Sequence, residues 1–136
     1  DGSVNANRYI LFASQASGFD RVRADVGLVY NPSSGNLTTS GDITAFSDRS
    51  IKKDIQPIKD ALNKVDKING VTFERINGPS DVRSAGVIAQ DVQEVLPEVV
   101  REGEDGKLTV AYGNLVGLLV EAIKELRQEV KELKGE

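Results

Sequence analysis

The chain has 136 residues, of which 39% are hydrophobic and 28% are charged, and its formal net charge is −4. These values are typical of a soluble, folded protein of one or two small domains, and they argue against a general nucleic-acid binder because Lys and Arg form no stripe free of acidic residues. Cys and His are absent, which excludes disulfides, thiolate chemistry and Ser-His-Asp sites, so an enzyme of this sequence must use Lys, Asp, Glu or a terminal amine as its base.

Residues 1–46 are rich in Ser, Thr, Asn and Gly and hold five of the seven aromatic residues. Short apolar runs at 9–12, 26–30 and 36–39 predict β-strands, with turn-like sequences at Ser17-Gly18 and at 31–36 between them. So short a set of strands can hardly enclose a core of its own. We therefore expect this segment to pair with other chains and to belong to a longer protein.

Two short helices are predicted after residue 47. Pro57 suits the first turn of the first helix, which Asn69-Gly70 ends. The second helix fits residues 87–96 and ends at Pro97. The apolar residues of the first helix recur at helical spacing and are Ile58, Leu62, Val65 and Ile68.

Strands are predicted between and after these helices. Residues 71–76 alternate like a half-buried strand, before a break at 77–80. Residues 98–101 and 107–112 predict a hairpin around an acidic loop. The acidic residues of this loop are Glu102, Glu104 and Asp105. They lack the ligand alternation of a calcium site, so we interpret them as solvated loop charges.

The segment 113–134 is the most regular part of the sequence. Its apolar residues alternate spacings of three and four and define a heptad seam of Val116, Leu119, Ile123, Leu126, Val130 and Leu133. Glu129 at a g position and Lys134 at an e position can pair between parallel chains. An amphipathic helix packed on its own domain is the alternative.

The heptads do not fix the number of chains. Val and Ile at a with Leu at d favour dimers. The apolar face is broadened at its start, as larger assemblies or domain packing require, by Leu115, Leu118, Val120 and Ala122.

Ser47 and Lys52 form the one candidate nucleophile–base pair, and all Lys residues lie from Lys52 onward. A serine hydroxyl attacks a carbonyl only after losing its proton, and without His a neutral lysine amine is the available base. Free lysine titrates near about pH 10.4, so burial or a neighbouring cation must lower its pKa first. Spacing alone is a weak signal, and a Ser-Asp turn with a surface lysine is the alternative.

Three motifs stand in order in the second part of the chain. They are S-D-R-S-I-K-K-D-I at 47–55, G-V-I-A-Q-D-V-Q-E-V-L-P-E-V-V at 86–100, and L-T-V-A-Y at 108–112 before the terminal helix. Together they resemble the C-terminal intramolecular chaperone domain of phage endosialidases, tail spikes and tail fibres, over residues 47–136. The family more often has Arg-Leu where this chain has Ser50-Ile51.

The resemblance implies a homotrimer that guides the folding of its own preceding β-rich fibre and then cuts itself off. It implies that Ser47 is the nucleophile, that Lys52 is the general base and that the scissile bond joins Phe46 to Ser47. The expected fold is α+β: 1–46 is the distal end of a fibre of intertwined strands, 47–136 is a small mixed α/β chaperone and autoprotease domain, and 113–134 is the helix of a parallel trimeric coiled coil.

No cofactor, metal or small-molecule substrate is suggested, and no apolar run approaches the roughly 18 residues of a membrane span. The resemblance implies that the client fibre is in the virion and that the chaperone fragment is released in the host cytoplasm. Two other functions stay open. One is a non-catalytic trimeric fibre tip or receptor-binding module, and the other is a plain coiled-coil oligomerisation domain.

Overall fold

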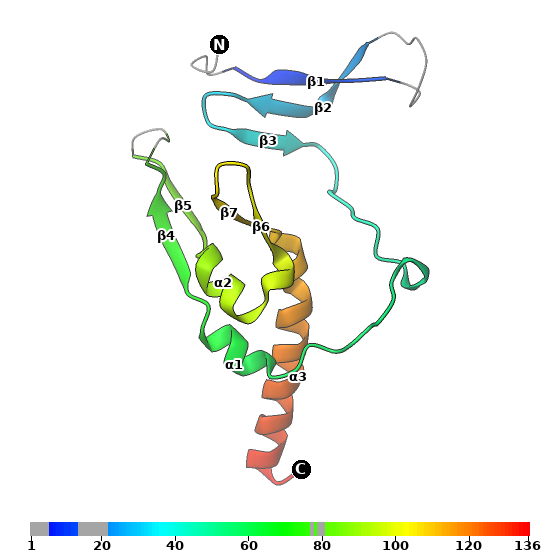
Figure 1. Ribbon diagram of the computed structural model, residues 1–136, viewed down its shortest axis with the longest axis vertical. Coiled ribbons are helices and arrows are strands. Elements are labelled where there is room, and N and C mark those ends of the chain that lie inside the picture. Colours follow the sequence, from blue (N-terminus) through cyan, green and yellow to red (C-terminus); the bar gives the residue numbers. More distant parts are fainter. Residues whose placement is uncertain (1–5, 14–21, 77, 79–80) are drawn as a thin grey trace. The chain divides into compact units, whose positions relative to one another are not determined.

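The computed structural model describes residues 6–13, 22–76, 78 and 81–136. It has small antiparallel sheets, short helices and one long C-terminal helix, in agreement with the predicted mixture of α and β structure (Figure 1). The chain divides into two compact units, Asp1–Ile51 with Glu74–Val82 and Lys52–Phe73 with Arg83–Glu136. Each unit is described by itself.

The first unit contains a three-stranded antiparallel sheet of β1 (Arg8–Phe12), β2 (Arg23–Asn31) and β3 (Asn36–Thr39), in the order β1-β2-β3. The three predicted strands are confirmed. The β2–β3 turn closes through a hydrogen bond from Gly35 N–H to the Asn31 carbonyl at 2.8 Å, and Gly35 has a φ of 73° that favours glycine. The predicted turn at Ser17-Gly18 lies outside the described residues.

This sheet buries little of its apolar surface. Among the described residues of the first unit, Val29 alone is buried. The exposed apolar residues of the three strands are Tyr9, Leu11, Phe12, Val26, Tyr30 and Leu37. A sheet needs a second layer over its apolar face to be stable on its own.

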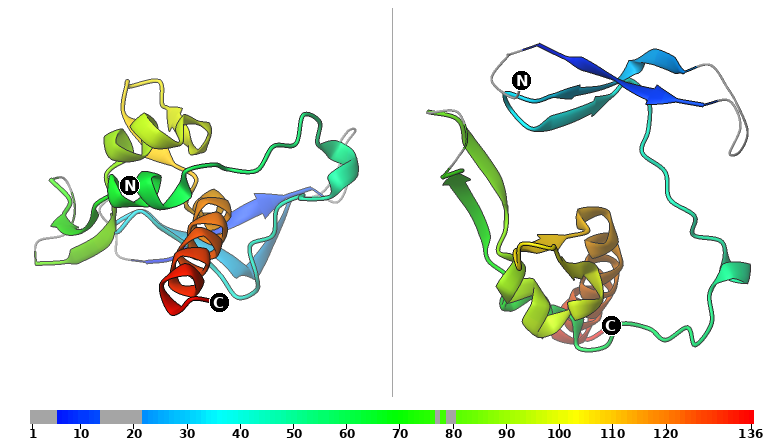
Figure 2. Two further views of the ribbon diagram at one scale, coloured as in Figure 1. Left: turned by 90° about the horizontal axis from the view of Figure 1, so that it is seen from below. Right: turned by 45° about the horizontal axis from the view of Figure 1, so that its top comes forward.

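The second unit has a core formed by helices and the hairpin. Its helices are α1 (Ala61–Asp66), α2 (Ala89–Val95) and α3 (Leu115–Lys134). Both α1 and α2 lie on the same side of α3 (Figure 2). The core residues are Ala61, Val92, Leu96, Val99, Val100, Leu118 and Ala122. Full burial of a Val or Leu side chain contributes about 1.5–3 kcal/mol.

Four further strands pair in two small sheets. One sheet pairs β4 (Gly70–Glu74) with β5 (Arg83–Val87), and the other pairs β6 (Val100–Glu102) with β7 (Leu108–Val110). The predicted hairpin is confirmed by the second pair. Its first strand starts at Val100, because Pro97–Val99 forms a 3₁₀ turn, η2, directly after α2. Most of the predicted break at 77–80 lies outside the described residues.

Both short helices differ in their bounds from the sequence prediction. The helix expected to begin near Pro57 begins at Ala61, because Asp60 adopts a left-handed conformation with φ 58°. Ile58 and Ile68 still pack on the core, although from outside α1. The expected helix over 87–96 is shorter, since Val87 belongs to β5, a strand that the sequence analysis did not predict. No described helix has both the length and the apolar character to span a bilayer.

Candidate functional site

Ser47 and Lys52 lie on either side of a short 3₁₀ turn, η1 (Arg49–Ile51). Both residues are exposed, and Phe46, the residue before the predicted scissile bond, is 95% exposed. In the single chain, the segment around the predicted scissile bond is therefore open to solvent.

Asp48 organises the turn between the two candidate catalytic residues. Its Oδ1 accepts hydrogen bonds from the Ser50 N–H at 2.7 Å and from the Ser50 hydroxyl at 2.5 Å. The Ile51 N–H donates to the Asp48 carbonyl at 3.4 Å. This is the side-chain turn that Asp and Ser favour locally. Ser50 therefore has a structural role in this chain.

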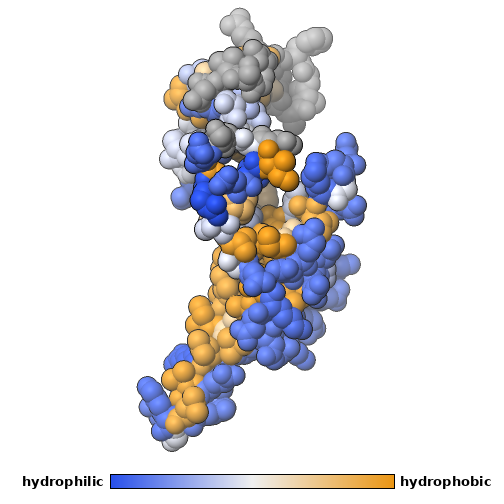
Figure 3. All heavy atoms as spheres, turned by 90° about the vertical axis from the view of Figure 1, so that its left-hand side faces the viewer, coloured by the Kyte–Doolittle hydropathy of each residue, from blue (hydrophilic) through white to orange (hydrophobic). Residues whose placement is uncertain are grey.

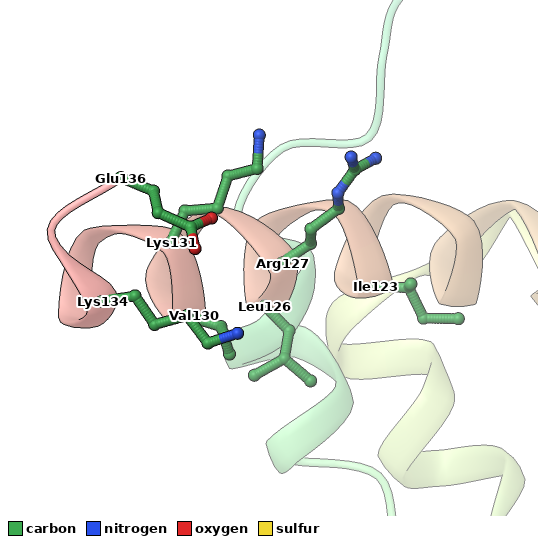
Figure 4. A pocket seen from close by; sticks show the side chains of 7 residues that line it. All are labelled: Ile123, Leu126, Arg127, Val130, Lys131, Lys134 and Glu136. Atoms are coloured by element: carbon green, nitrogen blue, oxygen red, sulfur yellow. The ribbon is translucent and has the colours of Figure 1, made fainter.

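The predicted seam of α3 is exposed along its whole length. Its six residues are between 42% and 89% exposed, and they are Val116, Leu119, Ile123, Leu126, Val130 and Leu133. Figure 3 shows apolar surface running along α3. Figure 4 shows Ile123, Leu126 and Val130 following one another along the helix beside Arg127 and Lys131, where they line a shallow pocket.

A different face of α3 packs against the rest of the second unit. Leu118 is 1% exposed and Ala122 is 5% exposed, and Leu115 packs against the same core. The broadened apolar face at the start of the helix thus serves domain packing in part, one of the two uses that the sequence left open, while Val120 is 44% exposed. The helix α3 therefore has two apolar faces, one packed within its own chain and one exposed.

The second and third motifs meet in the second unit. The Val87 N–H donates a hydrogen bond to the Tyr112 hydroxyl at 3.2 Å, and the Ala111 N–H donates to the Val99 carbonyl at 2.8 Å. A Cβ on Gly86 would lie 2.3 Å from the Tyr112 hydroxyl oxygen, closer than side-chain contacts allow. Gly86 therefore lets the aromatic ring of the third motif approach the backbone of the second.

Glu125 is a structurally important residue that the sequence analysis missed. Its Oε1 accepts a hydrogen bond from the Ala61 N–H at 2.9 Å and its Oε2 accepts one from the Leu62 N–H at 2.8 Å. No signal in the sequence indicates this, because Glu125 stands among other charged residues of a long helix. Among the described residues no group of acidic side chains is arranged to hold a metal ion.

Known proteins resemble this chain over most of its length. Residues 47–101 match the family model described as chaperone of endosialidase. The long tail fiber protein Gp37 of Enterobacteria phage K3 is 40% identical over 126 residues, which are 84% of this chain and 10% of the relative. The protein of the same name from Enterobacteria phage T2 is 46% identical over 96 residues, 65% of this chain and 7% of the relative.

A third relative, the long tail fiber protein Gp37 of Enterobacteria phage Ox2, is 34% identical over 116 residues, 79% of this chain and 45% of the relative. The chain thus spans less than half the length of each of these three relatives. The family match begins at Ser47 and includes the first two motifs, and the structure joins the second motif to the third. Residues 47–101 of this chain are therefore similar to the chaperone of endosialidase family.

Proposed function

We propose that this chain is the C-terminal chaperone of a phage tail fibre, with the distal end of its client fibre attached. Two features coincide at residue 47: the family match begins there, and the sheet-forming segment with its exposed apolar residues has just ended. The similarity to long tail fiber proteins supports a fibre as the client. In this proposal the fibre stays in the virion, and the fragment 47–136 is left in the host cytoplasm.

The exposed seam of α3 supports assembly through this helix, and we propose a parallel homotrimer. A row of six apolar side chains, each at least 42% exposed, is unfavourable in water and is buried when further copies of the helix pack against it. Parallel chains also bring Glu129 of one helix close to Lys134 of the next. Replacement of Ile123 by Asp should give monomers in sedimentation, with the circular dichroism of the second unit retained.

Assembly through α3 would hold the fibre ends in register. Intertwined β structure has many contacts between residues distant in sequence. Its chains must therefore be aligned before strand pairing can stabilise it. A trimeric helix raises the effective concentration of the three attached sheets. Once the fibre has folded, removal of the chaperone takes away the template, and unfolding of the fibre becomes effectively irreversible.

We propose that the chain cuts itself between Phe46 and Ser47. Lys52, as a neutral amine, takes the proton of the Ser47 hydroxyl. The Ser47 Oγ attacks the Phe46 carbonyl carbon at the same time. The bond from this carbon to the Ser47 nitrogen breaks, and the nitrogen leaves as an amine with the transferred proton. Water then hydrolyses the resulting ester, which gives a Phe46 carboxylate and restores the serine hydroxyl.

Burial of Lys52 in the assembled oligomer would make cleavage depend on assembly. In the single chain Lys52 is exposed to water. Contacts with neighbouring chains would remove that water and favour the neutral amine. The monomeric Ile123→Asp variant is expected to remain uncut, and cleavage of this variant as fast as the wild type would contradict the coupling.

Gel electrophoresis of the purified chain, with N-terminal sequencing of the fragments, tests the cleavage. The wild type is expected to give a fragment that begins at Ser47, whereas Ser47→Ala and Lys52→Ala stay intact. Lys52→Arg also stays intact, since arginine keeps its proton. Lys53→Ala, which removes the neighbouring lysine, is the matched control and should be cut.

A non-catalytic trimeric fibre tip is the second candidate function, favoured by the exposure of both candidate catalytic residues and by the similarity to fibre proteins. A wild-type chain that forms trimers yet stays intact during folding would support this function instead.

A further inference from the structure

The N-terminus of α1 is capped by a side chain from α3. Asp60, the residue before the helix, is left-handed, and its carboxylate binds the Asn63 side-chain amide instead of a free backbone N–H. The first two N–H groups of the helix, from Ala61 and Leu62, donate to the two oxygens of Glu125. A carboxylate at this end also interacts favourably with the helix dipole.

This cap lies at the packing contact between α1 and α3. Ala61 is fully buried, and Leu118 is 1% exposed in the facing helix. Just before the helix, the side chain of Ile58 approaches α3 so closely that a Cβ on Gly117 would lie 3.6 Å from its Cδ1. The chain leading into α1 is therefore held against α3 at Ile58 and again at Ala61.

The same helical turn of α3 takes part in the seam. Glu125 stands between Ile123 and Leu126, which are 65% and 49% exposed, and it points to a different face of the helix. Any contact that fixes the seam in an oligomer also fixes this turn and its carboxylate. On the other side of the cap, the chain from Lys52 to Asp60 contains no helix or strand and leads directly into α1.

We propose that Glu125 is a positioning residue that links seam formation by α3 to the placement of Lys52. This inference rests on the proposed self-cleavage. Seam contacts fix the turn of α3 that carries Glu125, its carboxylate fixes the start of α1, and α1 fixes the segment that leads back to Lys52. Glutamine keeps one oxygen acceptor at this position, whereas alanine keeps none.

The test compares Glu125→Ala and Glu125→Gln with the wild type in the full chain. Glu132→Ala is the matched control, because Glu132 is an exposed glutamate of the same helix whose carboxylate accepts a hydrogen bond from Gln128 only within α3. Sedimentation measures the oligomer, and gels measure the cleavage rate. Amide hydrogen exchange at Ala61 and Leu62, measured in a Ser47→Ala background, reports on the cap without cleavage.

Loss of a helix cap typically shifts a local equilibrium by about fivefold or more. Glu125→Ala is therefore expected to keep the oligomer, to speed exchange at Ala61 and Leu62 and to slow cleavage, the last two by about fivefold or more. Glu125→Gln should lie between it and the wild type, and Glu132→Ala should match the wild type. In both the exchange rate and the cleavage rate, the change from the wild type should be largest for alanine and smaller for glutamine at this position.

Unchanged cleavage in Glu125→Ala, or loss of cleavage together with loss of the oligomer, would overturn the positioning role. An uncut wild-type chain would overturn the proposed self-cleavage and with it the link to Lys52. Exchange at Ala61 and Leu62 would then still decide whether Glu125 holds α1, so the two failures are distinguishable.

Discussion

Leucines in the two units of the chain have opposite surroundings. Leu118 of α3 is 1% exposed, whereas Leu37 of β3 is 58% exposed, and both belong to regular elements with apolar neighbours. The second unit therefore gains its hydrophobic stabilisation within one chain, but the sheet of β1–β3 does not. The proposed order of events requires this difference, because a chaperone must fold before its client and the client must need other copies.

The largest expected effect comes from Leu118→Ala. Removal of a fully buried leucine leaves a cavity and costs about 2–5 kcal/mol. Chemical denaturation of a seam-disrupted, monomeric Ile123→Asp chain, monitored by helical circular dichroism, measures this loss. Leu119→Ala, at the next position and 48% exposed, is the matched control and should be nearly neutral in the monomer.

If both leucine variants lost similar stability in the monomer, the distinction between the core face and the seam face of α3 would be wrong. In the assembled chain the result should change, since Leu119 then becomes buried and its replacement weakens the oligomer.

The next effect is expected at the junction of the second and third motifs. A methyl group on Gly86 would meet the Tyr112 hydroxyl, so Gly86→Ala forces the ring to move and should cost about 1–3 kcal/mol. Tyr112→Phe removes the oxygen at 2.3 Å and leaves the ring carbon behind it at 3.3 Å from the new Cβ. The double variant should therefore be less destabilised than the sum of the two single variants.

Denaturation of the four proteins of this cycle measures the coupling. Strict additivity would show that the ring and Gly86 do not constrain each other, and the close approach would then have no part in holding the motifs together.

The sequence predicts those elements that local patterns determine, and it misses those that depend on residues far apart in the chain. The strands at 9–12 and 36–39 and the heptads of α3 are visible in the sequence, because alternation and spacing are local properties. The β5 strand was missed because Arg83-Ser84-Ala85-Gly86 lacks β-branched residues and pairs only through β4.

Glu125 illustrates the same limit within the helix region. Its partners, Ala61 and Leu62, are more than 60 positions away in the sequence. Likewise, the left-handed Asp60 and this distant cap set the start of α1. The helix therefore does not begin at Pro57, although proline suits a first helical turn. Tertiary packing overrides a local preference of this kind.

A smaller effect in the single chain is expected for Leu37→Ala in the sheet. Because Leu37 is 58% exposed, its truncation in the monomeric Ile123→Asp chain should change stability by less than about 0.5 kcal/mol. In the assembled wild-type background the same change should destabilise the fibre segment, if other copies cover the sheet. Thermal unfolding in the two backgrounds gives both values, and a large loss in the monomer would mean that the sheet has a core of its own.

The smallest effect is expected at Asp105 in the β6–β7 loop. The Lys107 ammonium, 2.5 Å from an Asp105 oxygen, holds the pKa of this carboxyl below its usual value, with help from the Lys107 N–H. Since the pKa is lower in the folded state, the contribution to stability is present at neutral pH and is lost as the pH falls through the folded value. Both side chains are more than half exposed, so solvent screens the pair.

Asp105→Asn should therefore leave the melting temperature at neutral pH unchanged within error and should flatten its fall below about pH 4 only slightly. Melting curves recorded from neutral to acidic pH, with Glu104→Gln as the control, measure this; a loss at neutral pH as large as that of Gly86→Ala would place the loop within the core.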